Sequence, residues 1–337
     1  MASAAEAKPP RSAGARIATR VLPWLVTIAC FTFLYTRLAR AAGPDRGVAA
    51  YLLEVFASVS WSRWLVLMVA YSCFYLLVDT MVLWRVINWF NAKISFREIL
   101  PVRASTYIIS ILNEQVGKGA IALYLNRRSG VPGWELGSSM LFIMACELYY
   151  LLLWATVGLA LHWNDLPEAL SIFRVVPWVA AGATVLAAGV IWAFRSPRLA
   201  AAEWRNRRIL HAFREAKPWQ YGAILLLRSP SLLAGVLVYS IAAGLFGVDI
   251  PFLRMLTYFP LVVFGALVPG PFRAVAVTMW PTLFPEHAGQ MAVFGFVQHN
   301  FFVLFNAVIG LLFLRKTNRE LFDAENPGEP AVKGVVR

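Results

Sequence analysis

The chain has 337 residues, of which 59% are hydrophobic, and its mean hydropathy is +0.63. Soluble domains are about 45–50% apolar, so this composition excludes an ordinary soluble enzyme and predicts an all-α integral membrane protein. We attribute the net charge of +13 to cytoplasmic loops and to attraction for anionic lipid head groups, not to nucleic acid.

Six apolar runs are long enough to cross a bilayer, which takes about 20 residues in a helix. They cover approximately residues 21–38, 64–84, 137–161, 175–194, 221–246 and 291–314. We expect one membrane domain over 21–315, with a basic cytoplasmic loop at 195–220. Residues 1–20 are expected to form a basic cytoplasmic tail and 316–337 a disordered cytoplasmic tail. Both termini are then cytoplasmic, in the cell (inner) membrane.

Two further apolar stretches, 99–125 and 251–283, are each broken near the middle. Each is expected to be a re-entrant helical hairpin, although either could be one span. The region around the first stretch is rich in basic residues, which are Arg85, Lys93, Arg97, Arg103, Lys118, Arg127 and Arg128. Basic loops stay cytoplasmic. The first hairpin therefore enters from the cytoplasm, and the second enters from the opposite face.

The order of hairpin and following span occurs twice, at about 96–161 and 251–314. The two copies begin with similar residues, at Phe96 and Phe252, and end with similar residues, around Gly158 and Gly310. Three crossings separate them, so the copies have inverted topology. Inverted repeats with broken helices are a known plan of transporters. The alternative is a chance alignment of two apolar segments.

The break in the first hairpin carries a dense group of polar and glycine residues. They are Asn113, Glu114, Gln115, Gly117 and Lys118. Glycine lets the backbone approach a ligand closely, and free N–H groups at a helix start favour an anion. We expect this group to bind a phosphate or carboxylate head group. The alternative is a cytoplasmic loop of solvated charges.

The break in the second hairpin contains Pro269, Gly270 and Arg273. Proline ends a helix, and arginine suits bidentate binding of phosphate. We expect these residues to form the outward counterpart of the first site. The alternative is an external turn whose arginine reaches the membrane interface.

Several polar residues fall inside apolar spans, where an ionisable group is a functional candidate by default. They are Asp79, Glu147, Gln298, His299 and Asn300. Glu147 and His299 occupy matching regions of the two copies, so they could pair or relay a proton, or could simply clasp helices together. Arg228 also lies in a span, and we expect it to reach the cytoplasmic surface.

The stretch 113–131, followed by a span with Glu147, resembles the first signature of the lysylphosphatidylglycerol synthase transmembrane-region family of flippase-like proteins. The Pro-Gly-rich stretch at 268–273 resembles its second signature. The resemblance implies translocation of a lipid or handling of a lipid-linked glycoconjugate. Members that synthesise aminoacyl-lipids carry a soluble catalytic domain, for which 337 residues leave no room. Relatives often have a second glycine and a glutamate where this chain has Phe272–Ala276.

The leading hypothesis is a flippase-like transporter that moves an anionic amphiphile, a phospholipid or polyprenyl-phosphate-linked head group, between leaflets. Lys118 and Arg273 would bind the anion alternately. We find no catalytic motif and expect no cofactor and no metal, because no ligand spacing, P-loop or dinucleotide fingerprint is present. Two alternatives remain: a non-transporting scaffold that recruits a partner, and an integral membrane enzyme acting on a lipid head group.

Overall fold

The computed structural model describes residues 13–110, 114–164, 166, 168–199, 202–267 and 274–322, and within these residues it is helical without strands. The α-helices are α1 (Ala13–Ala42), α2 (Val48–Ser58), α3 (Trp61–Phe90), α4 (Phe96–Ser110), α5 (Glu114–Ser129), α6 (Gly133–Leu161), α7 (Val176–Arg195), α8 (His211–Glu215), α9 (Pro218–Leu245), α10 (Phe252–Leu267), α11 (Ala274–Leu283) and α12 (Ala288–Phe322). Short 3-10 helices are η1 (Glu168–Val175), η2 (Pro197–Leu199), η3 (Glu203–Asn206), η4 (Arg208–Leu210) and η6 (Pro285–His287).

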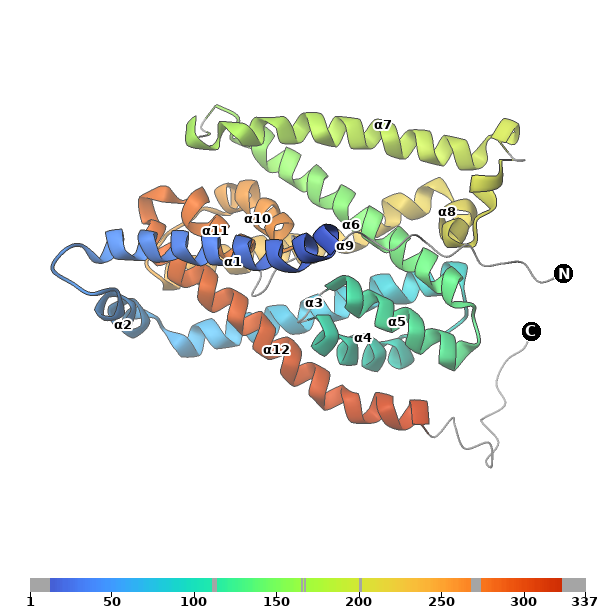
Figure 1. The fold of residues 1–337 in the computed structure, drawn as a ribbon, viewed down its shortest axis with the longest axis horizontal. Coiled ribbons are helices and arrows are strands. Elements are labelled where there is room, and N and C mark those ends of the chain that lie inside the picture. Colours follow the sequence, from blue (N-terminus) through green and yellow to red (C-terminus); the bar gives the residue numbers. More distant parts are fainter. Residues whose placement is uncertain are drawn as a thin grey trace.

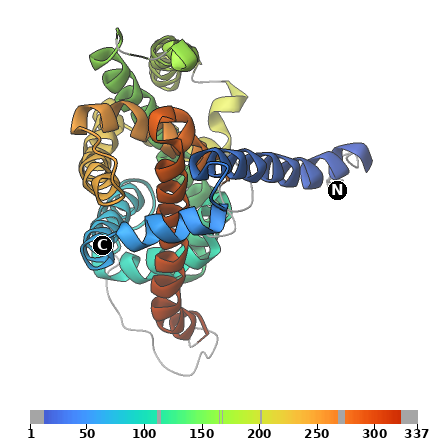
Figure 2. The same cartoon turned by 90° about the vertical axis from the view of Figure 1, so that its left-hand side faces the viewer.

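Six helices of the described chain are long and apolar enough to cross a membrane, which confirms the number of full-length spans expected from the sequence. These candidate spans are Trp24–Ala42, Trp61–Phe90, Gly133–Leu161, Leu170–Arg195, Pro218–Leu245 and Pro285–Leu314. The helix α2 was not expected; it follows α1 after a short turn and packs against it. The N-terminal part of α1 projects from the bundle, and α7 runs along one side, mainly against α6 (Figures 1 and 2).

Each of the two broken segments is a pair of short helices packed against each other, α4 with α5 and α10 with α11 (Figure 1). The helices α4, α5 and α10 contain 15, 16 and 16 residues. At a rise of 1.5 Å per residue they are about 22–24 Å long, and α11 is shorter still. A bilayer core is about 30 Å thick, so none of these helices has the length of a full span.

At the start of α4 the Glu98 side chain bonds back to Ser95, which is one half of a capping box. The backbone N–H of Ser95 donates to the Glu98 carboxylate at 2.8 Å, and the Ser95 hydroxyl donates to the same oxygen at 2.7 Å. The bonds from Ser95, together with the positive charge of Arg128, hold the pKa of Glu98 below its ordinary value. Arg128 donates to Glu98 at 2.9 Å and so links the end of α5 to the start of α4.

The second helix pair has a matching link at its open end. Arg254, near the start of α10, lies 3.7 Å from Glu286, just after α11. Aligning Phe96 with Phe252 places Glu98 at the position of Arg254. The open end of each helix pair is thus joined by one acidic and one basic residue. The acidic residue is on the first helix in one pair, and the basic residue is on the first helix in the other. Both links are partly exposed, so each contributes at most about 1 kcal/mol.

The two segments predicted to be copies, about 96–161 and 251–314, pack against each other reciprocally. The first helix of one copy, α4, lies against α12 of the other, and α10 lies against α6. Glycine permits both contacts: a Cβ on Gly158 would lie 2.6 Å from the Cα of Thr257 in α10, and a Cβ on Gly310 would lie 2.9 Å from the Cβ of Ile108 in α4. The Thr257 hydroxyl also donates to the Gly158 carbonyl at 2.9 Å.

We therefore expect Gly158→Ala to destabilise the protein by about 1–3 kcal/mol, because the new methyl group meets backbone atoms that cannot rotate away. Thermal unfolding in detergent measures this effect. Gly182→Ala in α7 is the matched control: nothing lies within 4 Å of its Cβ position, and alanine favours a helix over glycine by about 1 kcal/mol. Equal melting temperatures for the two variants would contradict the close contact between α6 and α10.

Candidate functional site

Five ionisable side chains from five helices meet inside the apolar bundle. We call them the ion-pair cluster: Asp79 of α3, Arg103 of α4, Lys118 of α5, Glu147 of α6 and Arg228 of α9. Their side chains are between 4% and 15% exposed. Three are cations and two are carboxylates. Charges at such depth are costly unless they are paired, and intramembrane pairs mark functional sites.

The cluster is a continuous chain of charge-assisted hydrogen bonds. Arg228 Nη2 donates to Asp79 Oδ1 at 2.6 Å and also to Glu147 Oε1. Lys118 Nζ donates to the other oxygen of Glu147 at 2.5 Å. At the other end, Arg103 Nε donates to Asp79 Oδ2. Each carboxylate therefore holds two cations, and Arg228 joins the two halves of the cluster.

Tyr107, one turn after Arg103 on α4, completes the shell around Asp79. Its hydroxyl donates to Asp79 Oδ2 at 3.1 Å. The Arg103 guanidinium lies over the Tyr107 ring, 4.5 Å from its centroid, in a cation–π contact. The aromatic ring and the carboxylate together orient the guanidinium.

The sequence interpretation of two arginines was wrong. Arg228 was expected at the cytoplasmic surface, but it is 4% exposed and bonded to Asp79 and Glu147. Arg103 was counted with the cytoplasmic basic residues, but it is 5% exposed and bonded to Asp79. The signal for both was the same as for Asp79: a charge within an apolar helix. Pairing then offsets the cost of burial.

The first predicted anion site is described only in part. Glu114, Gln115 and Gly117 lie in the first turn of α5, and Lys118 follows directly, so Gly117 lies inside the helix and not at the break. Lys118 is brought to Glu147, a partner that the sequence did not indicate. Asn113 lies outside the described residues.

Pro269, Gly270 and Arg273 of the second predicted site also lie outside the described residues, between the end of α10 at Leu267 and the start of α11 at Ala274. The second anion site, expected as the outward counterpart of the first, therefore stays a prediction.

The three polar residues predicted on α12 have different surroundings. Gln298 is 1% exposed, and neither its amide oxygen nor its amide nitrogen has a hydrogen-bond partner. His299 lies beside it along the same cavity. Asn300 donates to the Phe296 carbonyl of its own helix at 2.7 Å. Glu147 binds Lys118 and Arg228, so direct pairing with His299, one of the alternatives for these two residues, is not what the structure shows.

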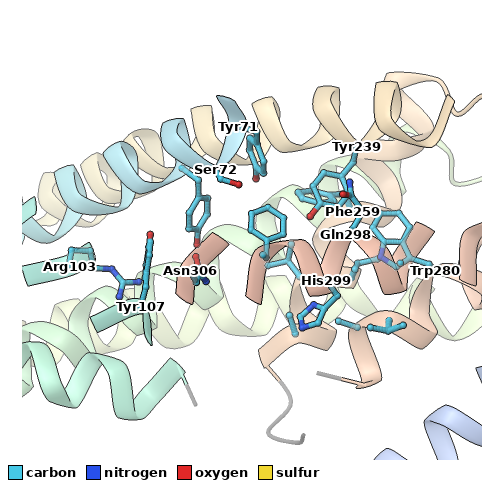
Figure 3. A pocket seen from close by; sticks show the side chains of 18 residues that line it. Tyr71, Ser72, Arg103, Tyr107, Tyr239, Phe259, Trp280, Gln298, His299 and Asn306 are labelled. Atoms are coloured by element: carbon cyan, nitrogen blue, oxygen red, sulfur yellow. The ribbon is translucent and has the colours of Figure 1, made fainter. Parts of the chain in front are cut away.

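A cavity of about 170 Å³ lies beside the ion-pair cluster. Helices α3, α4, α9, α10, α11 and α12 line it, so both predicted copies contribute to its wall. Arg103 and Tyr107 are at one end, and Trp280, Tyr239 and Gln298 are at the other (Figure 3). Most of the wall is aromatic or aliphatic.

The space inside the ion-pair cluster itself is much smaller, about 10 Å³. This is near the minimum for a single water molecule. A ligand would therefore occupy the larger cavity and meet the cluster through Arg103, which lines both spaces. Among the described residues, no group of three His, Cys, Asp or Glu side chains could hold a metal ion.

Comparisons with protein-family models, curated proteins and solved structures yield no match for this chain. The six apolar helices indicate an integral membrane protein.

Proposed function

We propose that the protein is a flippase-like membrane transporter that moves an anionic amphiphile between leaflets. The observation that carries the proposal is the ion-pair cluster opening through Arg103 onto a cavity lined by both predicted copies. Five buried charges are more than a structural clasp requires, because replacing a buried ion pair by apolar side chains is often neutral or stabilising. A cation at the end of an otherwise apolar cavity suits an anionic head group with an apolar tail.

The arrangement of helices supports the same proposal. Two pairs of helices too short to span, α4 with α5 and α10 with α11, would enter the membrane from opposite faces as re-entrant hairpins. Their reciprocal packing on α12 and α6 is what an inverted repeat would produce. The resemblance of 113–131 to a flippase-like family points in the same direction. In this proposal the cell membrane holds the protein with both termini in the cytoplasm.

Transport is tested in reconstituted vesicles with labelled anionic phospholipid, a short polyprenyl phosphate and a zwitterionic phospholipid. The wild type should move an anionic lipid in preference to the zwitterionic one. The double variant Arg103→Met/Asp79→Asn removes one charge of each sign and should slow movement roughly tenfold or more, since a lost charge-assisted hydrogen bond is worth about 1.5–3 kcal/mol.

The matched control is Arg46→Met/Glu54→Gln, which removes an exposed Arg–Glu pair with a separation of 2.6 Å. It should transport like the wild type. Absence of movement of any lipid by the wild type would refute the transporter, and a changed lipid product would favour the enzyme alternative. Equal transport rates in both double variants would show that Arg103 is not part of the transport site.

The orientation of the hairpins is tested by cysteine labelling in a variant without the three native cysteines. Arg97 and Arg127 are exposed at the open end of the first pair, and Leu253 and His287 at the open end of the second. Cysteine at either of the first two positions should react with an impermeant maleimide from one side only. Cysteine at either of the last two should react from the other side only. Labelling of all four from a single side would overturn the inverted repeat.

A further inference from the structure

The cavity beside the ion-pair cluster contains polar groups that the charge network does not use. Gln298 is 1% exposed, and both polar atoms of its amide lack a partner. The Ser72 hydroxyl, 3% exposed, also has no hydrogen-bond partner. Both residues line the cavity (Figure 3). Unpaired buried polar groups cost stability, so their presence here indicates that something else bonds to them.

The hydrogen-bonding chemistry of these two side chains limits the chemical class of ligand that fits the cavity. A glutamine amide both donates and accepts, and a serine hydroxyl does the same. A partner for both must itself donate and accept, as hydroxyl groups do. Ions of one sign and purely apolar groups do not meet this requirement.

The walls at the Gln298 end of the cavity are aromatic (Figure 3). Trp280 and Tyr239 are stacked with their planes 14° apart and their centroids separated by 5.6 Å. Gly295 makes room for the indole, because a Cβ at that position would lie 3.0 Å from Trp280 Cγ. Aromatic and aliphatic side chains at this end form an apolar wall, which suits the C–H groups of a saturated ring whose rim carries hydroxyl groups.

The size and the charge agree with such a ring. A cavity of about 150 Å³ holds benzene, so about 170 Å³ takes the carbon skeleton of one six-membered ring, whose hydroxyl and phosphate groups would then lie at the polar parts of the wall. At the opposite end, Arg103 presents a guanidinium, which suits phosphate oxygens. The cavity thus places a cation and a hydroxyl-binding amide at its two ends (Figure 3).

We propose that this cavity binds a polyol phosphate, with the phosphate at Arg103 and the hydroxyl groups of a six-membered polyol ring at Gln298 and Ser72. The inference rests on the proposed function and specifies its substrate: an amphiphile whose head group is a phosphorylated ring polyol.

Binding is tested separately from transport, by isothermal titration of the wild type in nanodiscs. The probes are myo-inositol 1-phosphate, inorganic phosphate and myo-inositol. The wild type should bind the polyol phosphate at least about tenfold more tightly than phosphate alone, because a site built for hydroxyl groups rejects ligands that lack them. Equal affinity for the two anions would overturn the proposal. Absence of a heat of binding with all three probes would show that the cavity holds only water, and this result would also overturn the proposal.

Gln298→Leu supplies the second readout. This variant should lose the preference for the polyol while retaining its phosphate affinity, and its melting temperature should rise, because an unpaired buried amide is removed. Asn300→Leu is the matched control on the same helix, since Asn300 bonds to Phe296 and is outside the cavity lining. It should retain the preference. An unchanged preference in Gln298→Leu would overturn the assignment of the amide.

The two proposals fail separately. A wild type that binds the polyol phosphate but moves no lipid keeps the site and refutes the transporter. A wild type that moves anionic lipid without preferring the polyol phosphate keeps the transporter and refutes this site.

Discussion

Arg228→Met is expected to destabilise the protein by about 3–5 kcal/mol, because it removes the cation shared by two buried carboxylates. Arg228 Nη2 contacts both Asp79 and Glu147, and its side chain is 4% exposed. Methionine has similar length, so the loss reflects charge more than packing. Thermal unfolding in detergent measures the loss. Arg63→Met, at an exposed position of α3, is the control and should change stability by less than about 0.5 kcal/mol.

The companion variant separates charge pairing from transport. Arg228→Met/Asp79→Asn/Glu147→Gln/Arg103→Met/Lys118→Met removes all five charges, and it should recover most of the lost stability, because no charge of the cluster is left buried without its partner. It should not recover lipid movement. A stable and active five-site variant would show that the ion-pair cluster has no part in transport.

Lys118→Met is expected to destabilise the protein by about 3 kcal/mol, at the lower end of the range for breaking a buried pair. The lower value applies because Glu147 loses Lys118 at 2.5 Å but keeps Arg228. A double-mutant cycle with Glu147→Gln measures the coupling, which should be about 1–3 kcal/mol in favour of the pair. Lys93→Met, at an exposed position, is the control. Additive effects of Lys118→Met and Glu147→Gln would contradict the pairing.

The same variant bears on the role first expected for Lys118. The sequence predicts that Lys118 binds the anionic head group directly, whereas the structure shows it neutralising Glu147 from α5. If Lys118 acts only through Glu147, Lys118→Met/Glu147→Gln should retain the relative preference for anionic over zwitterionic lipid. Loss of that preference in the double variant would support direct binding of the anionic head group by Lys118.

The spans and the breaks were predictable because hydropathy and helix-breaking residues act locally. About 20 apolar residues in succession have few alternatives to a membrane helix. Glycine and proline weaken a helix locally, but they do not always end it: Pro101 and Pro260 lie inside α4 and α10, and Gly117 lies inside α5. The ends of α4 and α10, at Ser110 and Leu267, fall close to the breaks that the sequence indicated. The short helix α2 was missed: its apolar residues at 48, 51, 52, 55 and 56 follow a helical repeat, but its 11 residues are too few to span a membrane.

The partners of the buried charges were not predictable in the same way. Arg228 lies 149 residues from Asp79, and sequence pattern alone gives no reason for them to meet. Arg103 looked like one more member of a basic flank. A charged residue in an apolar run has two low-energy outcomes, reaching the interface or finding a partner, and only helix packing decides between them.

The sequence by itself determined the membrane class, the number of full-length spans, the two interrupted segments and the presence of Asp79, Glu147 and Gln298 within apolar helices, since each follows from the order of polar and apolar residues along the chain. Only the tertiary structure decided that five charges form one cluster, that Arg228 joins it, and that Gln298 lies unpaired in a cavity with Arg103 at its other end. The reason is that hydrogen-bond partners and cavities depend on which helices pack together, here α3 with α9 and α4 with α12, and the two helices of each pair are far apart in the chain.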